Sequence, residues 1–240
     1  MTGRIAAILL SGVSCFLVSC ASTADKGGAP DVVYQADFSE GKWNKADFLN
    51  VKVPRFTLRN DFFQCDKYIT NEPPAENGKK TRHKSGHDYT SMLLDRKIVG
   101  GSSISSRLSF GKRMAPLIVL SGAPGVGKDG LPEFREHLEI VLFDQGINIW
   151  NHSYKDGKQI WFKAAYIKMP FQPSVIYDLE VSVKFAPDGL CQLAVSCDGT
   201  ELLGCATTVL KPDQPYYAGI TGYEGPCRFY DFKVVKAAGK

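Results

Sequence analysis

Helical periodicity is almost absent from residues 31–240 of this 240-residue chain. Turn residues recur there at short intervals, between runs in which apolar and polar residues alternate. The sequence also lacks internal repeats and low-complexity segments, so a single domain is the simplest organisation. With 44% hydrophobic and 22% charged residues, the composition is that of a globular protein large enough for a two-layer core. We therefore predict one all-β sandwich domain over residues 31–240.

A strong charge of either sign is missing too, because the formal net charge is only +4. We expect no nucleic-acid partner. Part of the positive charge is local, because several basic residues crowd one loop, where they could meet an anionic glycan or lipid headgroups, although a solvated loop is the favoured interpretation. The residues of that loop are Lys79, Lys80, Arg82, His83, Lys84 and His87.

Metal-binding motifs are also lacking. There is no CxxC pair and no His/Cys spacing typical of a zinc site. His83, His87, His137 and His152 show no metal-ligand spacing on a recognisable element. We expect no metal and no cofactor, and the residues give no support for a structural calcium ion.

A nucleotide-binding loop is only partly present. The segment from Gly122 to Asp129 matches the first seven positions of a phosphate-binding P-loop. Asp129 stands where the magnesium-binding Ser or Thr is required, and Gly130 and Pro132 would interrupt the helix that follows. We expect a glycine-rich loop between strands and no nucleotide partner.

The one long apolar run lies at the N-terminus, between Arg4 and Cys20, and it is too short to span a bilayer stably. It ends in Leu17-Val18-Ser19-Cys20, which resembles the lipobox of bacterial lipoproteins. That resemblance implies a signal peptide over residues 1–19, cleavage before Cys20, acylation of Cys20 and a flexible tether over residues 20–30. It also implies an exported protein anchored at the bacterial cell envelope through its lipid. Ala21, in place of an aspartate, resembles the outer-membrane-sorted pattern of diderm cells.

The cysteines that follow the leader are odd in number, so at least one thiol is left unpaired. In a two-residue hairpin at Asp198-Gly199, Cys197 would face Thr200 and Cys191 would face Ala206. No two cysteines are then directly opposed, and a bridge between Cys65 and Cys227 stays open as another possibility. The five cysteines are Cys65, Cys191, Cys197, Cys205 and Cys227.

Three successive strands, over 138–143, 147–152 and 159–164, carry both aromatic and polar side chains. Because side chains alternate along a strand, Asn148, Trp150 and His152 share one face. This row suits a sugar-binding surface, while a cross-strand packing ladder is the structural alternative. Further strands are expected over residues 32–38, 56–58, 62–68, 91–94, 103–110, 115–120, 177–185, 191–196, 201–206, 216–221 and 228–235, with a long surface loop over 71–86.

A glycine-bounded loop after residue 221 places Tyr223, Glu224 and Arg228 at one rim of the sandwich. An aromatic ring, a carboxylate and a guanidinium group together suit a sugar ligand. The alternative is an ion pair between Arg228 and Glu224 that fixes the loop.

Carboxylates do not form a recognisable catalytic pair. Asp178 and Glu180 share a face, but Ser182 and Lys184 continue that face as a solvated one. Glu136 and Glu139 have odd spacing, so they would point to opposite faces of one strand, and Asp144 and Glu224 cannot be paired from the sequence.

The overall pattern resembles the concanavalin A-like lectin and glucanase superfamily. The segments that carry this resemblance are Asp37 to Gly41, Glu139 to Trp150, Tyr177 to Val183, Asp198-Gly199 and Arg228 to Phe232. The resemblance implies a jelly-roll β-sandwich of two antiparallel sheets whose concave face binds carbohydrate. It also implies that the first and last strands are adjacent.

The enzymes of that superfamily match less well. Glucanases of family 16 carry Glu-x-Asp-x-x-Glu on one strand, and this sequence has no such run. Residues Trp161 to Tyr166 are similar to a Tyr-Phe-Lys-Ala-Gly-x-Tyr box of jelly-roll alginate lyases, which would make Tyr166 a catalytic base and Arg107 the remnant of an arginine-rich strand. The accompanying Gln-x-His box is absent.

The sequence therefore favours a lectin-like module that binds a polysaccharide or other glycan without catalysis. Asn148, Trp150, His152 and Trp161 are the expected binding residues, aided by the rim residues. The alternatives are a divergent glycoside hydrolase or lyase of the same fold, and a structural envelope lipoprotein.

Overall fold

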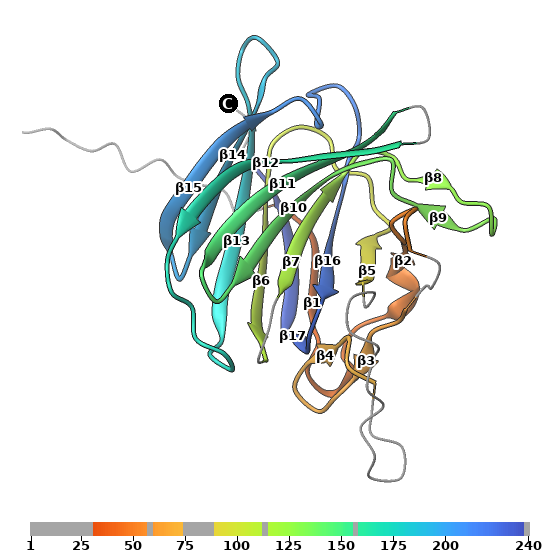
Figure 1. Ribbon diagram of the computed structural model, residues 1–240, viewed down its shortest axis with the longest axis vertical. Coiled ribbons are helices and arrows are strands. Elements are labelled where there is room, and N and C mark those ends of the chain that lie inside the picture. Colours follow the sequence, from red (N-terminus) through yellow and green to blue (C-terminus); the bar gives the residue numbers. More distant parts are fainter. Residues whose placement is uncertain (1–30, 57–59, 74–88, 112–114, 156–157, 238–240) are drawn as a thin grey trace, which may run out of the picture.

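The computed structural model describes residues 31–56, 60–73, 89–111, 115–155 and 158–237. Two antiparallel sheets stack face to face in this part of the chain, which confirms the predicted all-β jelly-roll sandwich (Figure 1). No helix among these residues is long and apolar enough to cross a membrane. The expected signal peptide, Cys20 and the tether lie outside the described residues.

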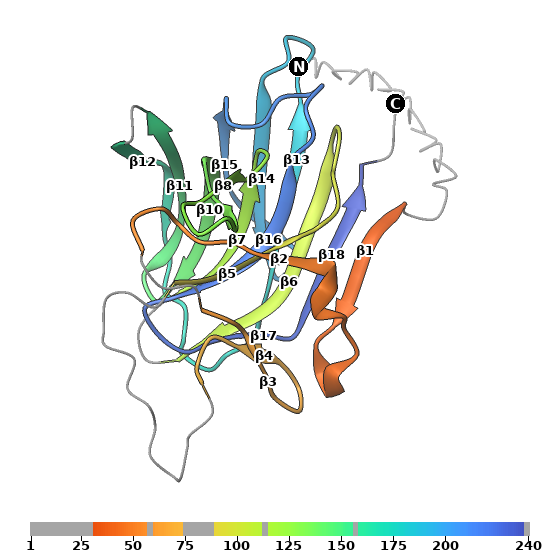
Figure 2. The ribbon, with the colours of Figure 1, turned by 90° about the vertical axis from the view of Figure 1, so that its right-hand side faces the viewer.

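Nine strands form the first sheet, in the order β15-β14-β13-β6-β17-β4-β3, with β18 also pairing with β6 and β1 pairing with β18. The first and last strands are thus adjacent, as the resemblance implied, and Figure 2 shows them side by side. The strands are β1 (Val32–Asp37), β3 (Phe63–Gln64), β4 (Ile69–Thr70), β6 (Ser102–Phe110), β13 (Tyr177–Phe185), β14 (Cys191–Cys197), β15 (Thr200–Thr207), β17 (Cys227–Phe229) and β18 (Asp231–Lys236).

The second sheet contains seven strands in the order β12-β11-β10-β7-β16-β5-β2, and a short hairpin of β8 and β9 stands beside it. Two 3₁₀ turns, η1 (Ser39–Gly41) and η2 (Lys45–Asp47), precede β2. The strands are β2 (Phe48–Asn50), β5 (Tyr89–Leu94), β7 (Pro116–Ser121), β10 (Glu136–Phe143), β11 (Gly146–Lys155), β12 (Lys158–Lys168) and β16 (Tyr217–Tyr223), with β8 (Gly125–Val126) and β9 (Pro132–Glu133) in the hairpin.

Alternation along the strands produces the main core. On β13, Leu179, Val181 and Val183 are fully buried between the sheets, and the intervening residues face outward. On β10, Leu138 and Ile140 fill the same space from the opposite sheet.

A second apolar cluster lies on the other face of the seven-stranded sheet. There Leu93 and Val119 pack against residues of the segments that cross this face, including Val53, Phe56 and Phe134. The crossing segments cover only part of the sheet, so β10, β11 and β12 keep an accessible outer face.

Some strand predictions need correction. The strand expected over 228–235 is interrupted at Tyr230, whose N–H donates to the carbonyl of Arg107, so it divides into β17 and β18. Within the strand expected over 62–68 only the short β3 forms, and it pairs with β4, which begins just beyond that range. Phe56 lies outside any strand, while residues 57–59 and most of the expected loop over 71–86 lie outside the described residues.

The P-loop-like segment forms the β8–β9 hairpin, with a turn at Lys128 to Gly130 and no helix after it. Asp129 in that turn lies 3.2 Å from the ammonium group of Lys52. This agrees with the expected glycine-rich connection between strands.

The five cysteines are free thiols. Cys197 faces Thr200 as predicted, but Cys191 faces Thr207 and not Ala206. A register shift between Val195 and Ser196 displaces the pairing by one residue.

Candidate functional site

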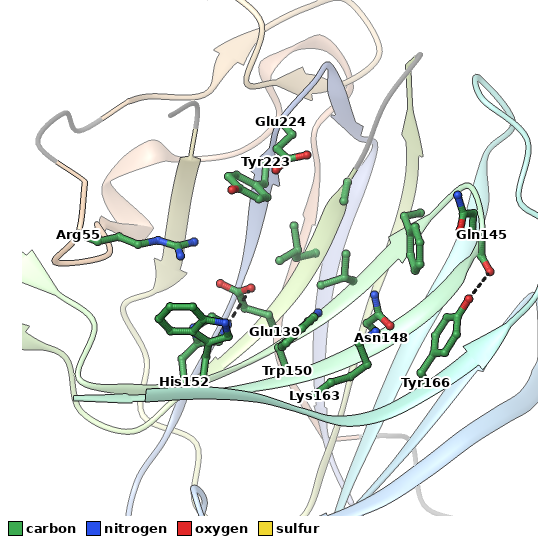
Figure 3. Close-up of a pocket in the computed structure, with 15 residues that line it drawn as sticks. Arg55, Glu139, Gln145, Asn148, Trp150, His152, Lys163, Tyr166, Tyr223 and Glu224 are labelled. Carbon is green, nitrogen blue, oxygen red and sulfur yellow. Dashed lines mark hydrogen bonds and ion pairs between the residues drawn. The ribbon is translucent and has the colours of Figure 1, made fainter. Parts of the chain in front are cut away.

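A cleft of about 410 Å³ opens on the outer face of the seven-stranded sheet (Figure 3). Its floor comes from β10, β11 and β12, and its rim from the end of β16 and from the segment that contains Arg55. The lining residues are Arg55, Ala115, Leu117, Glu139, Val141, Phe143, Gln145, Asn148, Trp150, His152, Trp161, Lys163, Tyr166, Tyr223 and Glu224.

The predicted row on β11 lies in this cleft. Asn148, Trp150 and His152 all line it, because alternate residues of one strand share a face. Ile147 and Ile149 point into the main core, as expected. Trp161 joins the row from β12, where it stands opposite His152.

A β-bulge decides which residues of β12 reach the cleft. Trp150 pairs with Lys163 and Ile149 pairs with Ala165, so Ala164 has no partner on β11. The extra residue reverses the alternation, and Trp161 and Tyr166 therefore face the same cleft despite their odd spacing. Simple alternation would have placed these two rings on opposite faces.

Cationic side chains lie against the aromatic rings of the cleft. Lys163 Nζ lies 5.2 Å from the ring centroid of Trp150 and 4.8 Å from that of Tyr166. Arg55 Cζ lies 5.9 Å from the ring centroid of Trp161. Tyr166 also donates its hydroxyl to the carbonyl of Gln145 at 3.2 Å. Cation–π contacts of this kind hold the ring planes in place.

The rim residues are separated by the fold. Tyr223 and Glu224 line the cleft, but Arg228 lies on β17 in the other sheet, where its Cζ is 5.5 Å from the Tyr68 ring centroid. The expected site of Tyr223, Glu224 and Arg228 is therefore not assembled. The alternative, an ion pair between Arg228 and Glu224, is also absent among the described residues.

Arg107 is likewise remote from Tyr166. It lies on β6 of the nine-stranded sheet and binds Asp231 through its backbone N–H and its guanidinium group. Tyr166 lines the cleft without this arginine, so the lyase-like combination of these two residues is not assembled.

The structure adds a buried cluster that the sequence did not reveal, formed by His137, Glu139 and His152. His137 Nε2 lies 3.2 Å from Glu139 Oε1, and His152 Nε2 lies 3.2 Å from Glu139 Oε2. The two imidazole rings stack with centroids 4.7 Å apart. Tyr89 donates its hydroxyl to Glu139 Oε1 at 2.8 Å.

Electrostatics hold this cluster in a defined state. Burial alone would raise the pKa of Glu139, but the adjacent imidazoles of His137 and His152 overcome this effect and hold that pKa well below its ordinary value. Burial lowers the pKa of His137, which favours its neutral imidazole. Burial, with the nearby charge of Glu139, raises the pKa of Tyr89 well above its ordinary value, so Tyr89 remains a donor. Glu139 is thus a carboxylate that accepts hydrogen bonds near neutral pH.

The register of the β10–β11 hairpin could have revealed the cluster. Phe143 pairs with Gly146 across a two-residue turn, and counting back from there places His137 opposite His152 and Glu139 opposite Trp150. The odd spacing of Glu136 and Glu139 was the wrong comparison, because Glu139 meets His137 two residues away on β10 itself and His152 on β11. Arg55 and Tyr89 left no comparable local signal.

The sequence matches no protein-family model and no curated protein. Solved structures do match the fold. LamAcat from Zobellia galactanivorans is 12% identical, with a TM-score of 0.54 over 86% of this chain and 98% of that one. The carbohydrate recognition domain of Emp46p is 15% identical, with a TM-score of 0.54 over 82% of this chain and all of that one.

A third similar structure is a GlcNAcα1-4Gal releasing endo-β-galactosidase from Clostridium perfringens. It is 9% identical, with a TM-score of 0.56 over 88% of this chain, which spans 64% of that longer chain. At these identities the likeness concerns the fold alone, a jelly-roll sandwich of two antiparallel sheets.

Proposed function

We propose that the cleft on the seven-stranded sheet binds carbohydrate without changing it chemically. The observation that carries this proposal is the arrangement of Trp150, Trp161 and Tyr166 along one open cleft beside polar groups. Aromatic rings stack on the apolar faces of sugar rings, while amides and charged groups bind the hydroxyls. Trp161 is 52% exposed and lines the cleft, so its ring is accessible to a ligand there.

The polar groups suit this role by position and chemistry. Asn148 is buried in the cleft floor, and its Oδ1 makes no hydrogen bond within the described chain. Arg55 and Glu224 stand at the rim. A sugar hydroxyl that donates to Asn148 Oδ1 would satisfy this buried acceptor, which otherwise carries a desolvation cost. The carbohydrate-related names of the structures with the same fold support the same interpretation.

Two adjacent aromatic residues on β12 provide a test of this proposal and its control. Phe162 is 55% exposed and adjoins Trp161, but it does not line the cleft. On a glycan array and in subsequent titrations, Trp161→Ala should lower affinity at least about tenfold, or ~1.4 kcal/mol. Phe162→Ala should leave affinity unchanged. An array on which the purified protein binds no glycan, or an equal loss in both variants, would contradict the proposal.

One observation favours catalysis as a second candidate function, because two carboxylates, Glu139 and Glu224, line the same cleft. Glycosidases use such a pair to flank the scissile bond. Glu139 is held ionised, so it could serve only as a base or nucleophile, with Glu224 as the acid. Reducing ends released from a polysaccharide panel by the wild-type protein, and lost in Glu139→Gln and Glu224→Gln, would establish this candidate over simple binding.

For the N-terminal region we propose lipidation at Cys20 and anchoring at the bacterial cell envelope, in the outer membrane of a diderm cell. The lipobox-like Leu17-Val18-Ser19-Cys20 supports this, because multiple acyl chains give durable anchoring. In a bacterial host, labelled palmitate should appear in the wild-type chain and not in Cys20→Ser. A wild-type chain that carries no label would refute the anchor.

A further inference from the structure

We infer that His137, Glu139 and His152 form a binding site for a divalent transition-metal ion of the zinc class, open toward the cleft. One ligand atom from each residue lies within 4.8 Å of the other two. Imidazole and carboxylate are the donor types that zinc and its neighbours in the first transition row prefer. The inference does not depend on carbohydrate binding.

The spacing of the donors suits tetrahedral coordination. Bonds of about 2.1 Å at tetrahedral angles place ligand atoms ~3.3 Å apart. Each imidazole Nε2 lies 3.2 Å from one carboxylate oxygen of Glu139. A small shift of these side chains would therefore place an ion between them.

One of the three ligand atoms has no hydrogen bond. His152 is only 5% exposed, and its Nε2 makes no hydrogen bond with any described group, although Glu139 Oε2 is near. A buried ring nitrogen without a partner is costly in an ordinary polar network. A metal ion would occupy the lone pair of this nitrogen.

Neighbouring side chains orient two of the ligands, as residues that contact metal ligands do in known metal sites. The side-chain amide of Gln159 lies 3.0 Å from His152 Nδ1, and the amide can present either its oxygen or its nitrogen there. With the oxygen facing Nδ1–H, the neutral tautomer leaves Nε2 free for the metal. Tyr89 meanwhile orients Glu139 through its hydroxyl.

The burial of the three ligands differs in a useful way. His137 is fully buried beneath the Phe134 ring, with centroids 4.3 Å apart, whereas Glu139 and His152 line the cleft. An ion held here has an entry path and a free coordination position on the cleft side. Three protein ligands with one open position are typical of zinc sites that also contact a substrate or water.

The test is titration of the chelator-treated full protein with Zn²⁺ by calorimetry, and with Co²⁺ by visible absorption. We expect one ion per chain. His152→Phe, which keeps a ring against His137, and Glu139→Gln should each weaken Zn²⁺ affinity by at least about 100-fold, since even outer residues are worth 10- to 100-fold. Gln159→Leu should weaken it by about tenfold. The control is Glu136→Gln, an exposed carboxylate on the same strand, which should have no effect.

Failure to bind one equivalent of Zn²⁺ or Co²⁺ would overturn the inference, as would unchanged binding in both ligand variants. Should either variant fail to fold, as judged by circular dichroism, the Co²⁺ spectrum of the wild type decides the question. Ligand-field bands without sulfur charge transfer support the His137–Glu139–His152 site. A thiolate charge-transfer band would assign the ion to the cysteines and refute it.

Discussion

Tyr89 and Glu139 form a hydrogen bond, although the strands that carry them are separated by two other strands of the seven-stranded sheet. The Tyr89 hydroxyl on β5 lies 2.8 Å from Glu139 Oε1 on β10, and β16 and β7 run between them. The two long side chains meet above the residues of the intervening strands. This bond connects one end of the sheet to the cleft floor and fixes the carboxylate at the centre of the site.

Removal of that hydroxyl should destabilise the fold. Tyr89→Phe leaves a buried carboxylate with one donor fewer, and hydrogen bonds to charged groups contribute about 1.5–3 kcal/mol. We expect a loss of ~2 kcal/mol in the free energy of unfolding, measured in urea at pH 7. Tyr217→Phe is the control, because Tyr217 is buried in the same apolar cluster and its hydroxyl has no hydrogen bond to a described residue. Equal losses in the two variants would show that the Tyr89–Glu139 bond contributes nothing specific.

The fold was largely predictable because half-buried strands carry their own periodicity. The alternation of Leu179, Val181 and Val183 marked β13, and glycine turns marked the β10–β11 hairpin. The β8–β9 hairpin and the break at Tyr230 left no such signal, because single backbone hydrogen bonds and short bridges decide them.

The site was predictable only where one strand determines it. The alternation of side chains along β11 placed Asn148, Trp150 and His152 on one face. The bulge at Ala164 reverses this alternation on β12 and so brings Tyr166 to the same face. Bulges depend on how neighbouring strands twist together, and one strand's sequence does not encode that. Arg55 reaches the cleft through contacts far apart in the chain.

Gly219 on β16 should not tolerate a side chain. A Cβ atom there would overlap the carbonyl oxygen of Met92 and approach Cα of Leu93 within 2.8 Å, and both are backbone atoms of β5. We expect Gly219→Ala to destabilise the protein by about 2 kcal/mol, in the range of overpacked cores. Gly122→Ala is the control, since nothing lies within 4 Å of its added Cβ. A Gly219→Ala protein with wild-type stability would mean that β5 moves freely against β16.

The thiols should differ widely in reactivity. Burial raises the pKa of Cys227 to about 12, and its Sγ lies 3.4 Å from the carbonyl oxygen of Gly225, whereas Cys65 is partly exposed. Thiolates are the reactive form, so Cys65 should be alkylated in the native protein while Cys227 stays protected. Mass spectrometry after brief labelling checks the order.

Labelling of the unfolded protein without reductant tests the pairing itself. All five cysteines from Cys65 to Cys227 should then react, because each is a free thiol. Two of them left unlabelled until reductant is added would reveal a disulfide, as the alternative bridge between Cys65 and Cys227 requires.

Asp178 should destabilise the protein near neutral pH. Partial burial and the charges of Asp231, Glu180 and Asp198 raise its pKa above the ordinary 3.8, although Arg107 opposes them. Since the folded state then holds the proton more tightly than the unfolded state, ionisation of Asp178 lowers stability as pH rises through its folded pKa. Asp178→Asn removes that repulsion, and we expect a gain of about 0.5 kcal/mol at pH 7, small because the side chain is exposed.

The pH dependence separates this charge effect from a packing effect. Below the ordinary pKa of 3.8 the wild-type carboxyl is protonated in both states, so the advantage of Asp178→Asn should vanish there. Urea unfolding at pH 7 and at a pH below 3.8 measures the difference in unfolding free energy between the wild type and Asp178→Asn. Glu201→Gln, an exposed carboxylate on β15, is the control for a general reduction of negative charge. A gain that persists at low pH would attribute the effect to the new amide, because no repulsion remains to be relieved.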